Sequence, residues 1–334
     1  MISGIKKNIR GNFFILLAII SVISCNTSKQ GMHKKELLSK YDPAKPFAES
    51  HFMNIGGYSV HYRFWNVDTD KIKGKLILIH GLGGSTFSWR KNIPALVDEG
   101  YLCVAIDLPA FGFSSREKGY NHSAFNRAET IWTLLDSLDK SMPPKSAQLK
   151  WNLVGHSMGG SVIAAMAQEK PTRSLSLVFI SGAVDADTMI RSYRGIFNFP
   201  PARWLLGSVM KTFFFNYSGI KKLLGSAYGK SPEKEDIAGY LAPFKLKHTA
   251  RGLFDMVRKS NSSKILRLKN ITQPAFLIWG DKDTWIPLKM GEDLNKALPN
   301  SQLVKIHGAA HCSMETRPDT VNTAIIHFLN SVNH

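Results

Sequence analysis

The stretch LVGHSMGGSVIAA, residues 153–165, joins an apolar, strand-like approach to a helix-like exit. Ser157 stands at the join, and three glycines lie around it: Gly155, Gly159 and Gly160. Such a corner is either a tightly packed turn or a sharp strand-to-helix bend that exposes a serine hydroxyl as a nucleophile. Side chains at the glycine positions would clash across the turn or hold the helix away from the strand. The motif alone does not decide, because chance gives G-x-S-x-G in about one chain of this length in ten.

Strand-like and helix-like segments alternate along the rest of the chain. Two alternating runs around Gly56 and Gly57 predict a β-hairpin over residues 51–66. Short apolar segments predict six further strands, at residues 75–80, 101–107, 151–155, 175–181, 274–280 and 301–307. Helical patterns cover residues 124–138, 158–168, 289–298 and 317–332. Because buried parallel strands are apolar on both faces, this order predicts an α/β fold with a mostly parallel, doubly wound sheet.

One connection is much longer than the others. About 90 residues separate the sixth strand from the seventh, whereas a whole βαβ unit needs roughly 30. We therefore expect a helical cap over residues 185–268, inserted after the sixth strand and dividing the core into residues 47–184 and 269–334. Residues 191–264 contain 14 Lys or Arg and four acids, a local charge of +10. The cap is expected to be apolar beneath and basic outside.

Five motifs resemble those of the α/β-hydrolase superfamily, in its branch of serine esterases and lipases with a cap. They are HGLGGS (80–85), DLPAFGFSS (107–115), GHSMGG (155–160), GDKDTWIP (280–287) and GAAH (308–311). The resemblance extends over about residues 50–332. Each motif follows a predicted strand, at the edge of the sheet where folds of this class bind their ligands.

The resemblance implies a catalytic triad, which in this superfamily runs along the chain as serine, acid, histidine. Ser157 is then the nucleophile, Asp283 the acid and His311 the base. Asp281 is a rival acid, but the family pattern places the acid three residues after the glycine of GDKD. His307 is a rival base, although it belongs to the predicted strand and His311 lies in the loop beyond it.

An oxyanion hole is also implied by the resemblance. Its two backbone N–H donors are expected from Met158, just after the nucleophile, and from Leu82 in HGLGGS, with Gly83 as the alternative to Leu82. His80 and His156 are common family residues at their positions, and we interpret both as supporting residues.

A serine nucleophile implies acyl transfer. The expected function is cleavage of carboxylic esters, including acylglycerol-like lipid esters, through an acyl-enzyme intermediate. Related dehalogenases and epoxide hydrolases carry Asp where this chain has Ser157. Carbon–carbon (meta-cleavage) hydrolases and perhydrolases also use serine, so both stay open, as does a non-enzymatic binder that keeps the fold. No metal-ligand spacing or phosphate loop appears, and we expect no cofactor. Trp89, Trp279 and Trp285 lie near the motifs, where they either line an acyl pocket or pack in the core.

The first residues differ in kind from the rest. Residues 1–24 resemble the signal peptide of a bacterial lipoprotein, because basic residues precede an apolar run at 13–23 and Cys25 follows a small residue. The run is short of the roughly 20 apolar residues that span a bilayer. Cys25 is the expected lipidation site, and residues 25–46 form a polar, Lys-rich tether.

Charge and cysteine content complete the expectation. The net charge of +18 is typical of a protein with an anionic partner. No nucleic-acid motif appears, and for a lipid-anchored, exported protein we expect that partner to be a membrane surface. The expected location is therefore the bacterial cell envelope. Apart from Cys25, the chain has only Cys103 and Cys312, too few for a disulfide framework. Nothing in the sequence indicates an oligomeric state.

Overall fold

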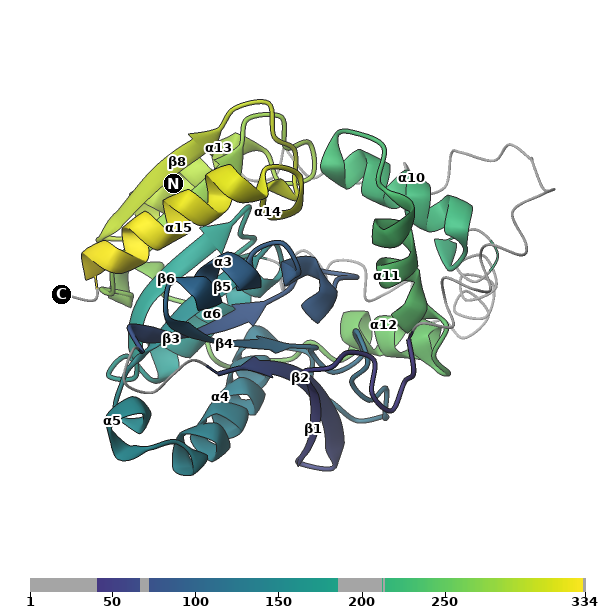
Figure 1. Ribbon diagram of the computed structural model, residues 1–334, viewed down its shortest axis with the longest axis horizontal. Coiled ribbons are helices and arrows are strands. Elements are labelled where there is room, and N and C mark those ends of the chain that lie inside the picture. Colours follow the sequence, from purple (N-terminus) through teal and green to yellow (C-terminus); the bar gives the residue numbers. More distant parts are fainter. Residues whose placement is uncertain (1–40, 67–71, 186–211, 213, 333–334) are drawn as a thin grey trace.

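A computed structural model describes residues 41–66, 72–185, 212 and 214–332 of the chain. A single eight-stranded sheet runs through the molecule, with helices packed against it (Figure 1). The strands are β1 (Ser50–Ile55), β2 (Tyr58–Trp65), β3 (Gly74–Ile79), β4 (Tyr101–Ile106), β5 (Trp151–His156), β6 (Ser174–Ile180), β7 (Ala275–Gly280) and β8 (Ser301–Ile306). They lie in the order β1-β2-β4-β3-β5-β6-β7-β8.

The sheet is mostly parallel, as predicted. Only the β1–β2 and β2–β4 pairs are antiparallel, and the pairs from β4 through β3, β5, β6 and β7 to β8 are all parallel. The predicted hairpin is the β1–β2 pair, which turns at Gly56 and Gly57, both with positive φ. The carboxyl ends of six parallel strands therefore meet at one edge of the sheet.

The helices form layers on the two faces of the sheet. In the core they are α3 (Ile93–Asp98), α4 (Ala124–Ser141), α5 (Pro144–Ala147), α6 (Gly159–Glu169), α13 (Leu288–Ala297), α14 (Ser313–Thr316) and α15 (Pro318–Val332), with the 3-10 turns η2 (Thr86–Trp89) and η4 (Leu268–Asn270). The four predicted core helices correspond to α4, α6, α13 and α15. The helices α3, α5 and α14 were not predicted, because six, four and four residues are too few to establish a helical period.

The central strands are buried on both sides, which explains their apolar sequences. In β3, Ile77 and Ile79 belong to one hydrophobic cluster, whereas Leu76 and Leu78 belong to the cluster on the opposite face. Successive side chains of a strand point to opposite faces, so two separate layers bury this one strand. Cys103 in β4 packs in the second cluster, and both Cys103 and Cys312 are buried free thiols.

A helical insertion follows the sixth strand, as predicted. It contains α10 (Tyr217–Tyr228), α11 (Lys234–Phe244) and α12 (Thr249–Arg258), all between β6 and β7. These helices are the green ribbons to the right in Figure 1. We call them the cap helices. The rest of the predicted cap, residues 186–211 and Phe213, lies outside the described residues, and its boundaries at 185 and 268 remain predictions.

The predicted signal peptide, Cys25 and most of the tether also lie outside the described residues. Among the helices in the described ranges, none has both the length and the apolar content that crossing a bilayer requires.

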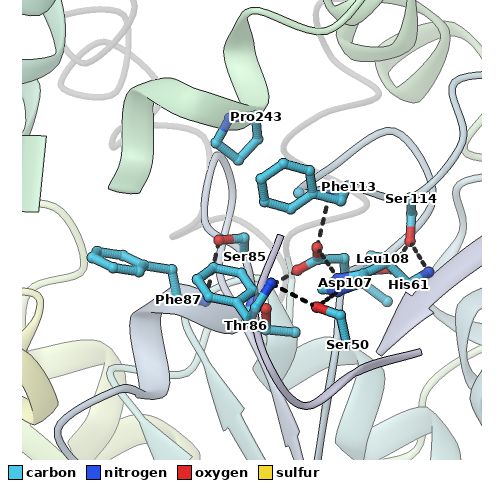
Figure 2. A network of polar contacts seen from close by, with 12 residues as sticks. Ser50, His61, Ser85, Thr86, Phe87, Asp107, Leu108, Phe113, Ser114 and Pro243 are labelled. Carbon is cyan, nitrogen blue, oxygen red and sulfur yellow. Dashed lines mark hydrogen bonds and ion pairs between the residues drawn. The ribbon is translucent and has the colours of Figure 1, made fainter. Parts of the chain in front are cut away.

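A buried polar network joins the loops that follow β3 and β4, at the functional edge of the sheet. Figure 2 shows the carboxylate of Asp107 at its centre. The Asp107 carboxylate accepts hydrogen bonds from the backbone N–H groups of Thr86 and Phe113, at 2.6 and 2.7 Å. His61 Nδ1 lies 2.7 Å from Asp107 Oδ2, and His61 Nε2 lies 2.8 Å from Ser50 Oγ. The network therefore fixes both loops relative to β2.

This serine–histidine–aspartate contact is structural. His61 and Asp107 are both fully buried, and the hydroxyl of Ser50 already accepts the N–H of Phe47, at 3.1 Å. Burial by itself raises the pKa of Asp107. His61, His80 and the N–H of Phe113 lower the pKa by more than burial raises it, so it lies below that of a free aspartate. The network thus stabilises the fold while Asp107 is ionised.

Asp107→Asn is expected to lower the free energy of unfolding near pH 7 by about 3 kcal/mol, the scale of a hydrogen bond to a buried charge. Because the folded-state pKa of Asp107 lies below the unfolded one, this stabilisation is present above about pH 4 and is lost as the pH falls further. Urea denaturation at pH 7 and at pH 3.5 measures it.

Asp293→Asn is the control, since Asp293 makes an exposed ion pair with Lys289 on α13 and should change stability by less than about 0.5 kcal/mol. An Asp107→Asn deficit that is equally large at both pH values would contradict the account.

Candidate active site

Ser157 occupies the corner between β5 and α6 in a strained backbone conformation. Its φ is +50°, a left-handed value that costs a residue with a Cβ about 1–2 kcal/mol. Three backbone bonds hold it there: the Ser157 N–H donates to Ile180 O at 3.0 Å, and Ser157 O accepts from Gly160 N and Ala183 N at 2.9 and 2.8 Å. The corner is therefore fixed by its surroundings. Ser157 is partly exposed, whereas His156 and Met158 on either side are buried.

The three glycines around Ser157 allow backbone segments to approach closely. A methyl group on Gly155 would lie 2.6 Å from the carbonyl oxygen of Gly159, and one on Gly159 would lie 2.4 Å from the carbonyl oxygen of Ile79 in β3. A methyl group on Gly160 would lie 2.8 Å from the Cα atom of Gly182. Any side chain at these positions would push α6 away from the sheet.

Asp283 and His311 form a buried pair in the loops after β7 and β8. Asp283 Oδ2 lies 2.9 Å from His311 Nδ1, and Asp283 Oδ1 accepts the N–H groups of Trp285 and Ile286, both at 2.9 Å. Burial raises the pKa of Asp283, but the bond and charge of His311 and the N–H of Ile286 outweigh it, so the pKa is lowered. The aspartate therefore stays ionised and fixes the imidazole with its Nε2 turned away from the carboxylate.

The rival acid and base pair with each other instead. His307 Nδ1 lies 2.8 Å from Asp281 Oδ2, and the N–H of Gly308 donates to Asp281 Oδ1 at 2.8 Å. The side chain of His307 is 97% exposed, whereas that of His311 is 3% exposed. The loops after β7 and β8 therefore hold two Asp–His pairs, and of these two only the Asp283–His311 pair is enclosed.

Two aromatic rings flank His311. The ring of His156 lies 4.7 Å from that of His311 between centroids, and His156 Nε2 lies 3.2 Å from the carbonyl oxygen of His311. Burial first, and then the proximity of His311, lowers the pKa of His156 to about 3, so His156 is neutral and adds no competing charge. This contact places the His311 loop against the Ser157 corner.

Trp285 stacks on His311, with centroids 5.2 Å apart and planes at 21°. The other two tryptophans near the motifs, Trp279 and Trp89, are fully buried in the core. Of the three tryptophans near the motifs, only Trp285 touches the Asp283–His311 pair. Its position two residues after Asp283 carried no signal that separated it from the other two.

The loop after β3 lies directly beside Ser157. A methyl group on Gly81 would lie 2.9 Å from Ser157 Cβ, so Leu82 and Gly83 border the nucleophile. The side chain of Leu82 is turned to solvent and is 52% exposed. Across the described part of the chain, the N–H groups of Leu82 and Met158 have no hydrogen-bond acceptor in the protein. Both donors are therefore available to a ligand atom.

His80 supports this loop from within. The N–H of Leu108 donates to His80 Nε2 at 3.1 Å, and His80 Nδ1 lies 2.7 Å from Gly81 O. Since Nε2 accepts, the proton of the neutral ring is on Nδ1 and is donated to Gly81 O. Burial lowers the pKa of His80 and keeps it in this form. His80 thereby fixes the turn that leads into Leu82.

Metal-binding groups are a separate question. Within the described ranges, no three His, Cys, Asp or Glu side chains are gathered so that they would hold a metal ion.

Residues 75–318 match the family model of the alpha/beta hydrolase fold. The chain belongs to this family. It is thus a hydrolase of the α/β fold. The Ser157 corner, the Asp283–His311 pair and the Leu82 loop lie at the ends of the strands β5, β7, β8 and β3.

Relatives of several activities match most of the chain. An uncharacterized hydrolase, YugF of Bacillus subtilis, is 29% identical over 283 residues, which are 82% of this chain and 96% of that protein. A 2-hydroxy-6-oxononadienedioate/2-hydroxy-6-oxononatrienedioate hydrolase of Cupriavidus pinatubonensis is 22% identical and covers 84% of this chain and 96% of its own length. Among solved structures, a membrane phospholipase A described as a bacterial virulence factor is 21% identical, covers 98% of this chain and 99% of that one, and has a TM-score of 0.67.

Asp283→Asn is expected to lower kcat for hydrolysis by roughly 10⁴-fold, because an amide that donates to His311 stabilises the wrong tautomer. Asp281→Asn is the matched control, since it changes the same kind of Asp–His contact at the exposed pair and should leave kcat within about twofold. Steady-state kinetics on any accepted substrate compares them. Equal losses in both variants would show that the enclosed pair has no special role.

Proposed function

We propose that this protein is a serine hydrolase that cleaves carboxylic esters through an acyl-enzyme intermediate. The observation that carries the proposal is that a strained, partly exposed Ser157 and the buried Asp283–His311 pair lie at the same edge of the sheet, with His156, the neighbour of Ser157, in contact with His311. A non-glycine residue held at positive φ is costly, and such strain is concentrated at functional sites.

Each step of the proposed reaction can be assigned to a residue of the site. Ser157 Oγ attacks the ester carbonyl carbon while His311 Nε2 takes its proton, and Asp283 stabilises the resulting imidazolium. The N–H groups of Leu82 and Met158 bind the oxyanion. The carbon–oxygen bond to the alcohol then breaks, and the alcohol leaves with the proton from His311. Water, deprotonated by His311, attacks the acyl-enzyme, which releases the carboxylic acid and restores Ser157.

An apolar acyl group is favoured by the surroundings of the oxyanion loop. Leu82 is one of the few large apolar side chains that are exposed in the described residues. From the cap, the ring of Phe244 comes so near Gly83 that a methyl group there would lie 3.6 Å from it. Phe215 lies against Phe244, with centroids 4.9 Å apart. Leu82 and the partly exposed Phe244 would gain burial from the chain of a lipid-like ester, by about 25 cal/mol for each Å² covered.

A second candidate is hydrolysis of carbon–carbon bonds. The Cupriavidus relative carries that kind of substrate in its name, and such enzymes resemble this chain in their serine. Ester cleavage is preferred because an exposed Leu82 and the ring of Phe244 near Gly83 offer apolar surface, whereas a dicarboxylate substrate needs cationic partners.

Activity-based labelling tests the proposal. A fluorophosphonate probe is expected to label wild-type protein on the peptide that contains Ser157, and Ser157→Ala should abolish both labelling and turnover. A panel of nitrophenyl esters of increasing acyl length, run beside a meta-cleavage substrate, is expected to give higher kcat/KM for medium and long chains than for acetate. Folded protein that resists the probe and cleaves no ester would refute the serine hydrolase assignment, and turnover of the meta-cleavage substrate alone would favour the second candidate.

We also propose that the protein works at a membrane in the bacterial cell envelope, anchored through a lipid on Cys25. The cap supports this, because its described helices and turns carry exposed lysines, namely Lys221, Lys222, Lys230, Lys234, Lys245 and Lys247. Each basic residue close to an anionic bilayer contributes about 1 kcal/mol of attraction.

Cys25→Ser is expected to move the protein from the membrane fraction to the soluble fraction, since a serine cannot carry the thioether lipid. Mass analysis of the N-terminal peptide shows whether the lipid is present. A wild-type protein that is recovered unlipidated and soluble would contradict the anchor, whatever its activity.

A further inference from the structure

The turn that carries His311 is fastened to the cap as well as to the core. Four residues after His311, the side chain of Glu315 on α14 is fully buried. Its Oε2 accepts hydrogen bonds from Arg90 and from the hydroxyl of Tyr228, the latter at 2.7 Å, and its Oε1 accepts the hydroxyl of Tyr240 at 2.5 Å. Arg90 belongs to the core, whereas Tyr228 ends α10 and Tyr240 lies in α11.

The charges in this cluster are arranged so that the cap is held by electrostatic attraction. Arg90 also binds Asp236 at the start of α11, so one guanidinium lies between two carboxylates, one from the base loop and one from the cap. Burial raises the pKa of Tyr228 and Tyr240, and the charge of Glu315 raises it further. Both hydroxyls therefore stay protonated and act as donors to Glu315.

The last turn of α10 makes three further contacts with the acid and base loops. The N–H of Cys312, next to His311, donates to Ala227 O at 3.1 Å. Trp285, which stacks on His311, donates from Nε1 to Ser226 Oγ at 3.0 Å. A methyl group on Gly229 would lie 3.1 Å from Ala310 Cβ. One helical turn of the cap thus touches the residues on both sides of the imidazole, and Figure 1 shows the end of α10 reaching toward α14.

We propose that Glu315 is a positioning residue for the base: it clamps the base loop to α10 and α11, so that the cap fixes His311 in addition to covering the substrate. The inference rests on the proposed role of His311. Its consequence is that loosening the cap lowers the rate of the chemical step, even for a substrate too small to touch the cap.

Glu315→Gln removes the charge at nearly constant shape. The new amide is neutral, so the ion pair with Arg90 is lost. If the amide oxygen faces Arg90, the N–H₂ group faces Tyr240, whose hydroxyl must then accept instead of donate; if the N–H₂ group faces Arg90, two donors are in contact. Tyr228→Phe is the milder variant, because it removes one hydrogen bond between α10 and Glu315 and leaves the Arg90 contact in place. It keeps the proposal testable if the Gln variant folds poorly.

The matched control is Asp139→Asn. Asp139 is likewise a largely buried carboxylate with three donors, which are Lys75 Nζ and Arg173 Nη2, both at 2.7 Å, and Trp151 Nε1 at 3.2 Å. It lies by the amino ends of β3 and β5, at the edge opposite the site. Its substitution should lower stability in the same way without touching the base loop.

Two measurements decide the proposal, and one of them needs no activity. The first is the rate at which a thiol reagent modifies Cys312, located by peptide mapping; burial raises the pKa of this thiol, so it reacts only when the base loop opens. We expect Glu315→Gln to raise this rate about 10- to 100-fold, and Tyr228→Phe to raise it less. The second is kcat for nitrophenyl acetate, expected to fall about 10- to 100-fold in Glu315→Gln with KM nearly unchanged.

The control Asp139→Asn should change neither the modification rate of Cys312 nor kcat. The proposal is overturned if the modification rate of Cys312 does not rise in Glu315→Gln, or if that rate rises while kcat of Glu315→Gln is unchanged. It is also overturned if Asp139→Asn reproduces both effects. A wild-type protein that a fluorophosphonate does not label would count against the proposed hydrolase, whereas the Cys312 measurement would still decide whether Glu315 clamps the loop.

Discussion

The closeness of α6 to β3 is the constraint on which the site depends. A methyl group on Gly159 would lie 2.4 Å from the carbonyl oxygen of Ile79, so this helix can start only if position 159 has no side chain. The approach forces the chain to reverse direction within one residue, and Ser157 takes the positive φ that the reversal requires. It also brings the loop at Gly81 into contact with Ser157, next to the two N–H groups proposed to bind an oxyanion. The conformation of Ser157 and the position of the loop that carries the proposed oxyanion donor Leu82 thus follow from one packing contact.

The proposed acid Asp283 and the proposed base His311 lie on separate loops, after β7 and β8, and buried hydrogen bonds hold them in place. Asp283 is held by two backbone N–H groups, and His311 is enclosed by His156, Trp285 and Asp283. The cap completes this enclosure, because the end of α10 contacts Cys312 and Trp285. In this view the cap and the core form one site. If His311 is the base, as proposed, these contacts would couple the position of the cap to the chemical step.

Most of the fold could be predicted because its central strands are apolar runs of a length that suits a buried parallel sheet, and five strands are followed by a motif. The bend at Ser157 and its glycines also follow from local sequence, since backbone clashes depend on neighbouring residues. The choice between Asp283 and Asp281 rested instead on the resemblance to the family pattern. Both occur in GDKD and both pair with a histidine, 28 and 26 residues away, and in the structure their burial separates the two pairs. The contacts of Glu315, Trp285 and Asp107 join distant segments, and the motifs that contain Asp107 and Trp285 do not specify these partners. The role of Cys25 rests on a part of the chain that the structure does not describe.

The central claim is that Ser157 carries the acyl group during turnover, and trapping that species tests it most directly. Protein mixed with a nitrophenyl ester, quenched with acid within milliseconds and digested, should yield the peptide containing Ser157 with its mass increased by one acyl group, while His311→Ala should slow the appearance of that peptide greatly. If ester is hydrolysed while the Ser157 peptide stays unmodified, or if the acyl group is found on another residue, the account is wrong.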